Sequence, residues 1–526
     1  EGGRMKPVNT FASELLRKVS KKDSYKDMDA NQVVVSMLTN PRAWYFVPFI
    51  YIKKENTKVR DLIGIPHDQK YARFSDLFTE KGEYKLTDEV SKAHKKKIKD
   101  KYEESILNID GRANLLFGAL GGSIFKFFPL PEDENNKWFS FIEVRHSGFK
   151  GEDSLYVSNI LPLYAGEVVA GAKSKDYSRA EEYLESIHKY QRKYGSAVVP
   201  SERKVELELF YNEYDIFKSL FSYYMLASLL MFIVVIINIF NDKKLIRVLI
   251  KICIGIILLL FAYHTVGLGI RWYISGHAPW SNGYESMIYV SWATMLFGVI
   301  FAKRSPLTLA ATTFVTSMLL MVAHWNWMDP SIGNLVPVLD SYWLMVHVAI
   351  IVASYGPFTI GMILGMLALL LYIFTNKKNK KKMSLAINEI TTINEMSLTI
   401  GLVMLTIGNF LGGIWANESW GRYWGWDPKE TWALISIIVY AFVLHMRLIP
   451  GLKSKYTFNM MSVFAFASIL MTYLGVNHLL SGLHSYAAGE SAAVPNQIWG
   501  WLGLSVILSI LAFIKFKKFY KKKKKS

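Results

Sequence analysis

The composition excludes a single soluble domain, because 51% of the 526 residues are hydrophobic and the mean hydropathy is positive, at +0.19. The formal net charge of +18 does not indicate nucleic-acid binding, since most of it gathers in short loops between apolar stretches. With Cys253 as its one cysteine, this sequence holds no internal disulfide, no dithiol redox centre and no Cys-x-x-Cys-His motif.

Residues 1–215 are predicted to form a soluble, mixed α/β domain. Charged runs alternate there with short aromatic and β-branched pieces, such as 43–52 and 136–144, and the spacing of apolar residues in 178–194 is typical of an amphipathic helix. The chain starts with Glu-Gly-Gly and not with Met, which indicates that it begins mid-protein. We therefore expect this domain to be entered from an upstream membrane span.

Nine apolar stretches follow, and each is near or above the ~20 residues that cross a hydrocarbon layer. They lie near 217–240, 245–268, 284–302, 306–324, 343–374, 393–414, 431–449, 457–480 and 497–516. Because lipid offers no hydrogen-bond partner to a bare backbone, these stretches should be helices. The predicted fold is an α-helical polytopic membrane protein, with a transmembrane domain at 216–517, a basic tail at 518–526 and an extracytoplasmic N-terminal domain.

Charge predicts the orientation. Residues 1–215 hold 35 Lys and Arg and 33 Asp and Glu. The rest of the chain therefore holds 26 of the 61 basic residues and 10 of the 43 acidic ones. Of those 26 basic residues, 22 lie in alternate loops, at 243–251, 303–304, 377–382, 447–455 and 515–525. By the positive-inside rule these loops are cytoplasmic, and the tail contacts anionic headgroups. Residues 1–215 and the loops around His277, 415–432 and His484 then lie outside the cytoplasm.

The loop at 415–432 carries five tryptophans and a Trp-Asp-Pro turn. Trp420, Trp424 and Trp426 offer rigid aromatic area that suits a flat, apolar ligand such as a porphyrin. The alternative is an interfacial tryptophan belt, which requires neither this density nor the string from Trp426 to Trp432. Asp427 precedes Pro428, so it is as well suited to cap the next helix as to contact a ligand.

Histidines near these loops are candidate ligands, since imidazole is a standard axial ligand of haem iron. His347 starts the fifth span and His484 follows the eighth, so both can flank an external site beside the tryptophans. His445 lies about 14 residues into the seventh span, roughly 20 Å below the outer boundary, where ionisable residues are uncommon and usually functional. One haem cannot reach both levels, so two sites at different depths are predicted.

Several histidines have structural alternatives. Structural roles are favoured for three histidines at outer helix ends: His264, His324 and His478. Taken by itself, His277 is more simply explained as an ordinary loop histidine. His445 could instead hydrogen-bond a neighbouring helix. The residues themselves do not select His484 over His478.

The loop at 420–432 also resembles the WWD signature of haem-handling membrane proteins, and within them the cytochrome c synthases of the system II pathway (CcsA or ResC type). The segments 276–286, 342–347 and 482–486 resemble that family's first external loop and its two external histidine segments. The resemblance covers roughly residues 215–520. With less specificity, residues 3–10 resemble a segment of the large fused synthases (CcsBA).

The resemblance implies a holocytochrome c synthase that exports haem b, as substrate and iron-bound cofactor, and joins it by thioether bonds to the Cys-x-x-Cys-His motif of apocytochrome c. It implies His347 and His484 as catalytic iron ligands, and His445 as one member of an inner pair whose partner comes from a CcsB-like upstream half or subunit. It further implies haem contacts from the tryptophan loop and first external loop: Trp420, Trp424, Trp426, Asp427 and His277. The resemblance also implies a thiol-reducing partner. It places the protein in the inner (cytoplasmic) membrane, with the tryptophan loop on the periplasmic side.

Two other classes are weighed against it. A haem transporter or chaperone would deliver haem without ligating it, and the longer string at 427–432 together with the large external domain favours the synthase. A dihaem quinol oxidoreductase needs histidine pairs about four turns apart on two helices. Here His264 and His277 alone have that spacing, and Gly276 places His277 outside the helix.

Overall fold

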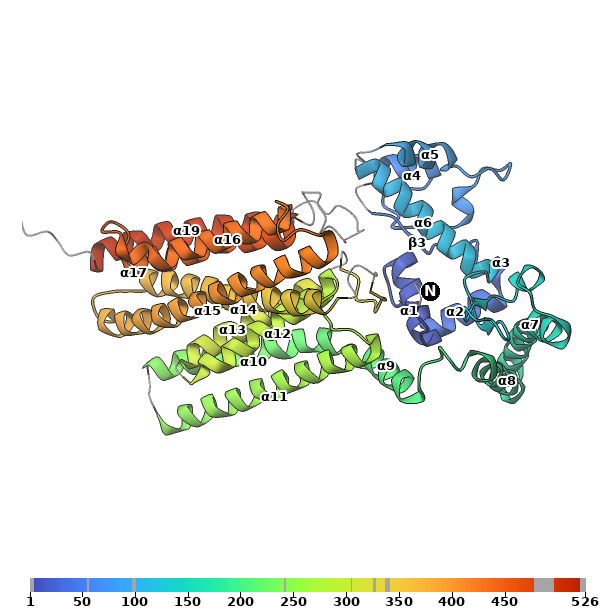
Figure 1. Ribbon diagram of the computed structural model, residues 1–526, viewed down its shortest axis with the longest axis horizontal. Coiled ribbons are helices and arrows are strands. Elements are labelled where there is room, and N and C mark those ends of the chain that lie inside the picture. Colours follow the sequence, from blue (N-terminus) through green and yellow to red (C-terminus); the bar gives the residue numbers. More distant parts are fainter. Residues whose placement is uncertain are drawn as a thin grey trace, which may run out of the picture. The chain divides into compact units, whose positions relative to one another are not determined.

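The computed structural model describes residues 4–53, 56–96, 101–240, 243–303, 305–324, 328–335, 341–476 and 496–520. The chain divides into two compact units, Glu1–Phe210 and Tyr211–Ser526. Figure 1 shows the first unit in blue to teal and the second in green to red.

The first unit is mainly helical, and its described strands form three antiparallel pairs of two residues each. The helices are α1 (Val8–Ser20), α2 (Ala30–Thr39), α3 (Pro41–Trp44), α4 (Thr57–Ile63), α5 (Thr87–Lys95), α6 (Lys101–Gly121), α7 (Gly151–Ser174), α8 (Ser178–Gly195) and α9 (Glu202–Tyr214), which runs on into the second unit. The strand pairs are β1 (Ser24–Tyr25) with β2 (Met28–Asp29), β3 (Ile50–Tyr51) with β4 (Tyr71–Ala72), and β5 (Phe128–Pro129) with β6 (Trp138–Phe139). The expected mixture of helix and strand is present, with helix dominant, and the predicted amphipathic helix is confirmed as α8.

Buried charge ties the start of this unit to α9. Arg4 donates to both carboxylate oxygens of Glu208, at 2.9 and 2.6 Å, and Thr10 donates to one of them at 2.7 Å. Glu208 is 2% exposed. A carboxylate so buried is tolerated because its charge is paired and its oxygens accept hydrogen bonds.

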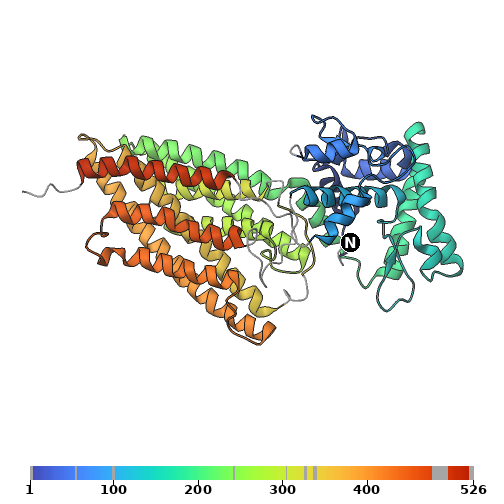
Figure 2. The same cartoon turned by 90° about the horizontal axis from the view of Figure 1, so that it is seen from above.

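The described part of the second unit contains nine helices long and apolar enough to cross a membrane, as predicted. They are α10 (Ile216–Phe240), α11 (Lys244–Ser275), α12 (Gly283–Ala302), α13 (Pro306–Ala323), α14 (Tyr342–Ile373), α15 (Lys380–Trp420), α16 (Pro428–His445), α17 (Lys455–Leu470) and α19 (Asn496–Phe519). α17 continues as a π-helical turn, η5 (Met471–Gly475). Figures 1 and 2 show these helices running side by side along one direction.

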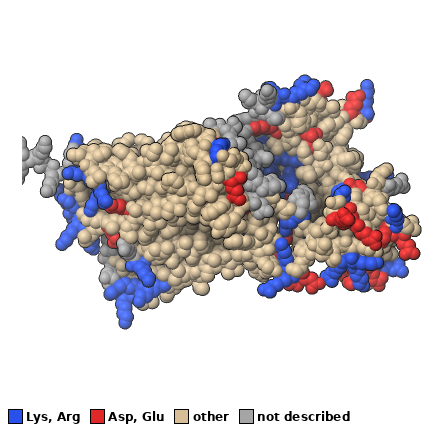
Figure 3. Space-filling view, in the orientation of Figure 1, with Lys and Arg blue, Asp and Glu red and all other residues tan. Residues whose placement is uncertain are grey.

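Charge on the visible face of the second unit lies mainly toward its ends. In Figure 3 most of its lysines and arginines gather at the left end, a few charged side chains lie near the other end, and the face between them is largely uncharged. Large apolar side chains of the long helices are exposed, among them Leu259 at 73% and Phe410 at 77% exposure. An apolar belt between charged ends is what a hydrocarbon layer requires of a protein that spans it.

α14 and α15 pack closely enough to need small residues at their contact. A Cβ atom added at Gly408 of α15 would lie 2.6 Å from Ile351 Cγ1 and 3.1 Å from the Ile351 backbone nitrogen. Ser397 of α15 also donates to the carbonyl of Pro357, a proline inside α14, at 2.8 Å. These contacts fix the position of α14, which carries His347.

Gly408→Ala should therefore push α14 away from α15. Overpacking of this kind costs about 1–3 kcal/mol, so we expect a lower thermal unfolding temperature of the detergent-purified protein. Gly255→Ala is the matched control, because a Cβ atom at Gly255 of α11 would meet nothing within 4 Å. Equal unfolding temperatures for the two variants would contradict the close approach at Gly408.

Candidate functional site

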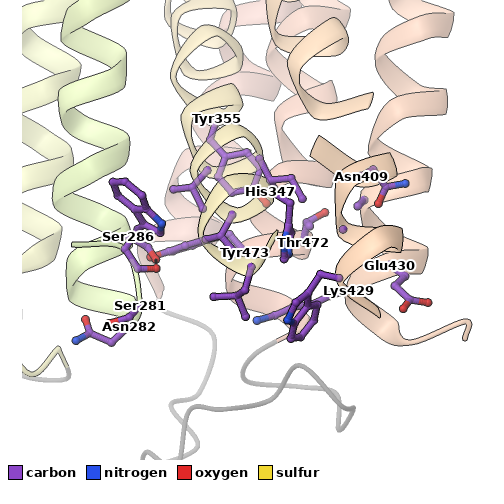
Figure 4. Close-up of a pocket in the computed structure, with 18 of the residues that line it drawn as sticks. Ser281, Asn282, Ser286, His347, Tyr355, Asn409, Lys429, Glu430, Thr472 and Tyr473 are labelled. Carbon is purple, nitrogen blue, oxygen red and sulfur yellow. Dashed lines mark hydrogen bonds between the residues drawn. The ribbon is translucent and has the colours of Figure 1, made fainter. Parts of the chain in front are cut away.

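A cavity of about 450 Å³ opens among the helix ends opposite the basic loops. This volume lies within the ~300–1,000 Å³ typical of sites for small molecules and cofactors. Its walls come from the segment before α12, from α14, α15, the tryptophan loop, the start of α16 and η5. Figure 4 shows His347, Tyr355, Lys429 and Tyr473 among the side chains that line it.

His347 is held in one orientation by its surroundings. Its Nδ1 lies 2.8 Å from the Trp343 carbonyl oxygen. Because a carbonyl only accepts, Nδ1 carries a proton, and in the neutral imidazole Nε2 then has the lone pair. The ring stacks on Trp415 with centroids 5.3 Å apart, and a Cβ atom at Gly412 would lie 3.3 Å from His347 Cδ2. A metal-binding histidine is commonly oriented by such a bond at its other nitrogen.

The three tryptophans singled out in the sequence take different positions. Trp424 lines the cavity. Trp420 packs edge-on against Trp415, with ring centroids 4.8 Å apart. Trp426 is 71% exposed and has a left-handed backbone with a φ of +57°. The tryptophan against His347 is thus Trp415, which is 1% exposed and which the sequence analysis did not single out.

Asp427 caps α16, which is one of the two roles that the sequence left open for it. Its side chain accepts from the Lys429 amide at 3.0 Å, and Glu430 completes a capping box. Glu430 Oε2 also accepts from the amide of Gly425 at 2.8 Å. Together these bonds join the tryptophan loop to the first turn of α16, which forms part of the cavity wall.

A buried ion pair supports the opposite wall. Arg271 and Glu285 are both 0% exposed and lie 2.9 Å apart. The second Glu285 oxygen accepts from the Ser281 amide and hydroxyl, at 3.0 and 2.6 Å. Asn282 caps α12 by accepting from the Glu285 amide at 2.8 Å. Ser281 and Asn282 line the cavity, so the pair holds this wall in place.

Arg271 also joins this wall to α9. It donates to the Tyr211 hydroxyl at 3.1 Å and to the carbonyls of Pro330 and Ser331 at 2.9 and 3.1 Å. Burial raises the pKa of Tyr211, although the adjacent guanidinium opposes the rise, so the hydroxyl stays neutral at physiological pH. No motif in the sequence pointed to this network. Charged residues on neighbouring apolar spans were the available signal.

The other predicted histidines do not join His347 within the described residues. His277 places its two ring nitrogens 3.1 and 3.0 Å from the carbonyls of Ala278 and Gly333, an arrangement that shapes the loop. His445 is exposed at the end of α16, with Nδ1 2.7 Å from the Ala441 carbonyl. It follows Lys429 by sixteen residues, or about 24 Å of helix. His484 and His478 lie outside the described residues.

The described fold and cavity define a multi-pass α-helical membrane protein with a cavity at one end of its helices. Residues 280–484 match the model of a family described as Cytochrome C assembly protein. The chain is 36% identical over 252 residues to the cytochrome c biogenesis protein CcsA of Prochlorococcus marinus (strain MIT 9301), which covers 42% of this chain and 80% of that protein. The chain belongs to this cytochrome c assembly family, whose members handle haem, and the resemblance seen in the sequence is confirmed.

Two further similar proteins match different shares of this chain. Protein NrfI of Wolinella succinogenes is 43% identical over 516 residues, which are 97% of this chain and 56% of NrfI. The chain thus spans little more than half the length of that relative. Among solved structures, Cytochrome c Heme Lyase CcmF matches with a TM-score of 0.39 and 14% identity, over 58% of this chain and 51% of CcmF.

Glu285→Ala should leave the Arg271 guanidinium buried without its counter-charge, which typically costs about 3–5 kcal/mol. We expect a large loss of monodisperse protein on size-exclusion chromatography in detergent. Adding Arg271→Met to this variant removes the unpaired charge and should recover part of the yield. Unchanged yield of Glu285→Ala would contradict the supporting role of the pair.

Proposed function

We propose that this chain, acting with a CcsB-like upstream half or subunit, exports haem b and attaches it covalently to apocytochrome c. The main support for the proposal is the position and orientation of His347 in the cavity wall. An imidazole with its Nδ1 proton on the Trp343 carbonyl presents a ligating nitrogen, and it does so in a cavity walled by Trp424 and Tyr473. A site of this kind suits a flat, apolar molecule with a metal at its centre.

The reaction adds each of two cysteine thiols of a Cys-x-x-Cys-His motif across one haem vinyl group. A C–S bond forms to one vinyl carbon and the thiol proton goes to the other carbon, so no oxidant or reductant is consumed. The contribution of the protein is to hold the haem where thiols can approach, which lowers the entropic cost of the encounter. In this proposal His347 and His484 ligate the iron, and the histidine of the incoming motif replaces one of them on release.

A second, inner site would receive haem from the cytoplasm at His445. Its exposure at the end of α16 supports a partner from another segment, and the CcsB-like half would supply the second histidine. We assign the basic helix ends to the cytoplasm by the positive-inside rule. The cavity and the domain at 1–215 would then face the periplasm, where a thiol-reducing partner keeps the cysteines of the apocytochrome available.

His347→Ala should abolish holocytochrome formation when the chain and its upstream half are co-expressed with a cytochrome c acceptor. Added imidazole should restore part of the yield, because a free ligand can occupy the coordination position that the substitution vacates. The measurement is covalent haem on the acceptor after denaturing electrophoresis. His94→Ala, an exposed histidine on α5, is the control and should match the unchanged protein.

Two results would decide against this proposal. Full holocytochrome yield from His347→Ala would show that His347 is not a required ligand of the haem iron. Covalent haem that forms only when a separate lyase is supplied would favour the haem transporter or chaperone instead.

A further inference from the structure

The cavity contains an asymmetry of charge that iron ligation does not explain. Among the described residues that line it, Lys429 alone has a lysine or arginine side chain, and Glu430 alone has a carboxylate. The remaining walls are aromatic, aliphatic, hydroxyl or amide groups. A single ammonium group in such a wall attracts anions more strongly than it would in water, because the local dielectric constant is lower.

The neighbouring carboxylates are engaged with the backbone. Glu430 Oε2 accepts from the amides of Gly425 and Asp427, at 2.8 and 3.3 Å, and Asp427 accepts from the amide of Lys429. Asp427 is also near enough to interact electrostatically with the Lys429 ammonium group. In Figure 4 Lys429 lies nearer to His347 and Tyr473 than Glu430 does.

The end of α16 does not itself attract a further anion. Lys429 is the second residue of α16, an 18-residue helix whose first turn lines the cavity. The partial positive charge of this N-terminus is already met by the carboxylates of Asp427 and Glu430 in the capping box. Attraction for another carboxylate at this part of the wall therefore comes from the Lys429 ammonium group.

We propose that Lys429 binds a carboxylate at the edge of the tetrapyrrole substrate, while His347 faces its metal. This inference rests on the proposed function and deepens it. Haem carries its two propionates on one edge and its two vinyl groups away from that edge. A lysine on α16 and a histidine on α14 would thus hold the substrate at two points, and the propionate contact sets which edge the thiols of the apocytochrome meet. Lys429 is a substrate-orienting residue in this arrangement.

The test compares two ligands that differ only at the carboxylates. Haem and haem dimethyl ester are titrated by visible absorption into the purified chain with its upstream half, for the unchanged protein, Lys429→Gln and Lys429→Arg. Lys429→Gln should weaken haem binding about 10-fold or more, the scale of one charge-assisted hydrogen bond. It should leave binding of the ester within about 2-fold, and Lys429→Arg should keep most of the affinity for haem.

Lys455→Gln is the matched control. Lys455 begins α17, where its ammonium group bonds Asn388 outside the cavity, so neither affinity should change. Equal weakening of haem and its ester by Lys429→Gln would overturn the inference, since it would show that Lys429 acts through the fold around Asp427. Unchanged binding of both ligands would overturn it as well. If the unchanged protein bound neither ligand, the proposed function would fail and the inference with it.

Discussion

The described transmembrane unit depends on one constraint, which is that a hydrocarbon layer offers no hydrogen bonds. Where a helix is irregular or ends, the backbone N–H and C=O groups that lose their helical partners must therefore bond other groups of the protein. In the described helices and the segments beside them, side chains bond backbone carbonyls at several irregular points. Ser397 donates to the carbonyl of Pro357 itself, and the hydroxyl of Thr472 in the π-helical turn η5 bonds the carbonyls of Ser468 and Trp432. Arg271 donates to the carbonyls of Pro330 and Ser331, in the connecting segment after α13.

The η5 turn and the segments that Arg271 and Glu285 bond lie beside the cavity. η5 contributes Thr472 and Tyr473 to its wall, and Arg271 with Glu285 supports the segment that contributes Ser281. A buried ion pair is a costly way to stabilise a fold, because desolvation offsets much of its attraction. Here the pair fixes the position of the short segment before α12, because that segment has no regular backbone hydrogen bonds to hold it. These bonds hold the described walls of the cavity in place.

The sequence predicted what depends on periodicity and on local rules. The nine predicted apolar stretches correspond to the nine long apolar helices found among the described residues. Asp427 caps α16, and Pro428 suits the first helical position. The sequence did not predict which tryptophan meets His347. Within the loop that choice depends on backbone torsions, such as the positive φ of Trp426, which no hydrophobic pattern encodes. Trp415 instead lies in the last turns of α15, and its contact with His347 depends on how α14 and α15 dock.

α16 connects the two sites of the proposed function, and its faces differ along its length. Its first turn borders the cavity through Lys429 and Ala433. Toward its other end Ile438, Phe442 and His445 are exposed, and their spacing of four and three residues places them on one face. None of the described helices covers that face. A haem bound at His445 would therefore lie outside the described bundle, and a helix of the CcsB-like half would have to enclose it. Passage to the cavity would then require movement along α16 and around its axis, so the two haem positions cannot merge into one broad site.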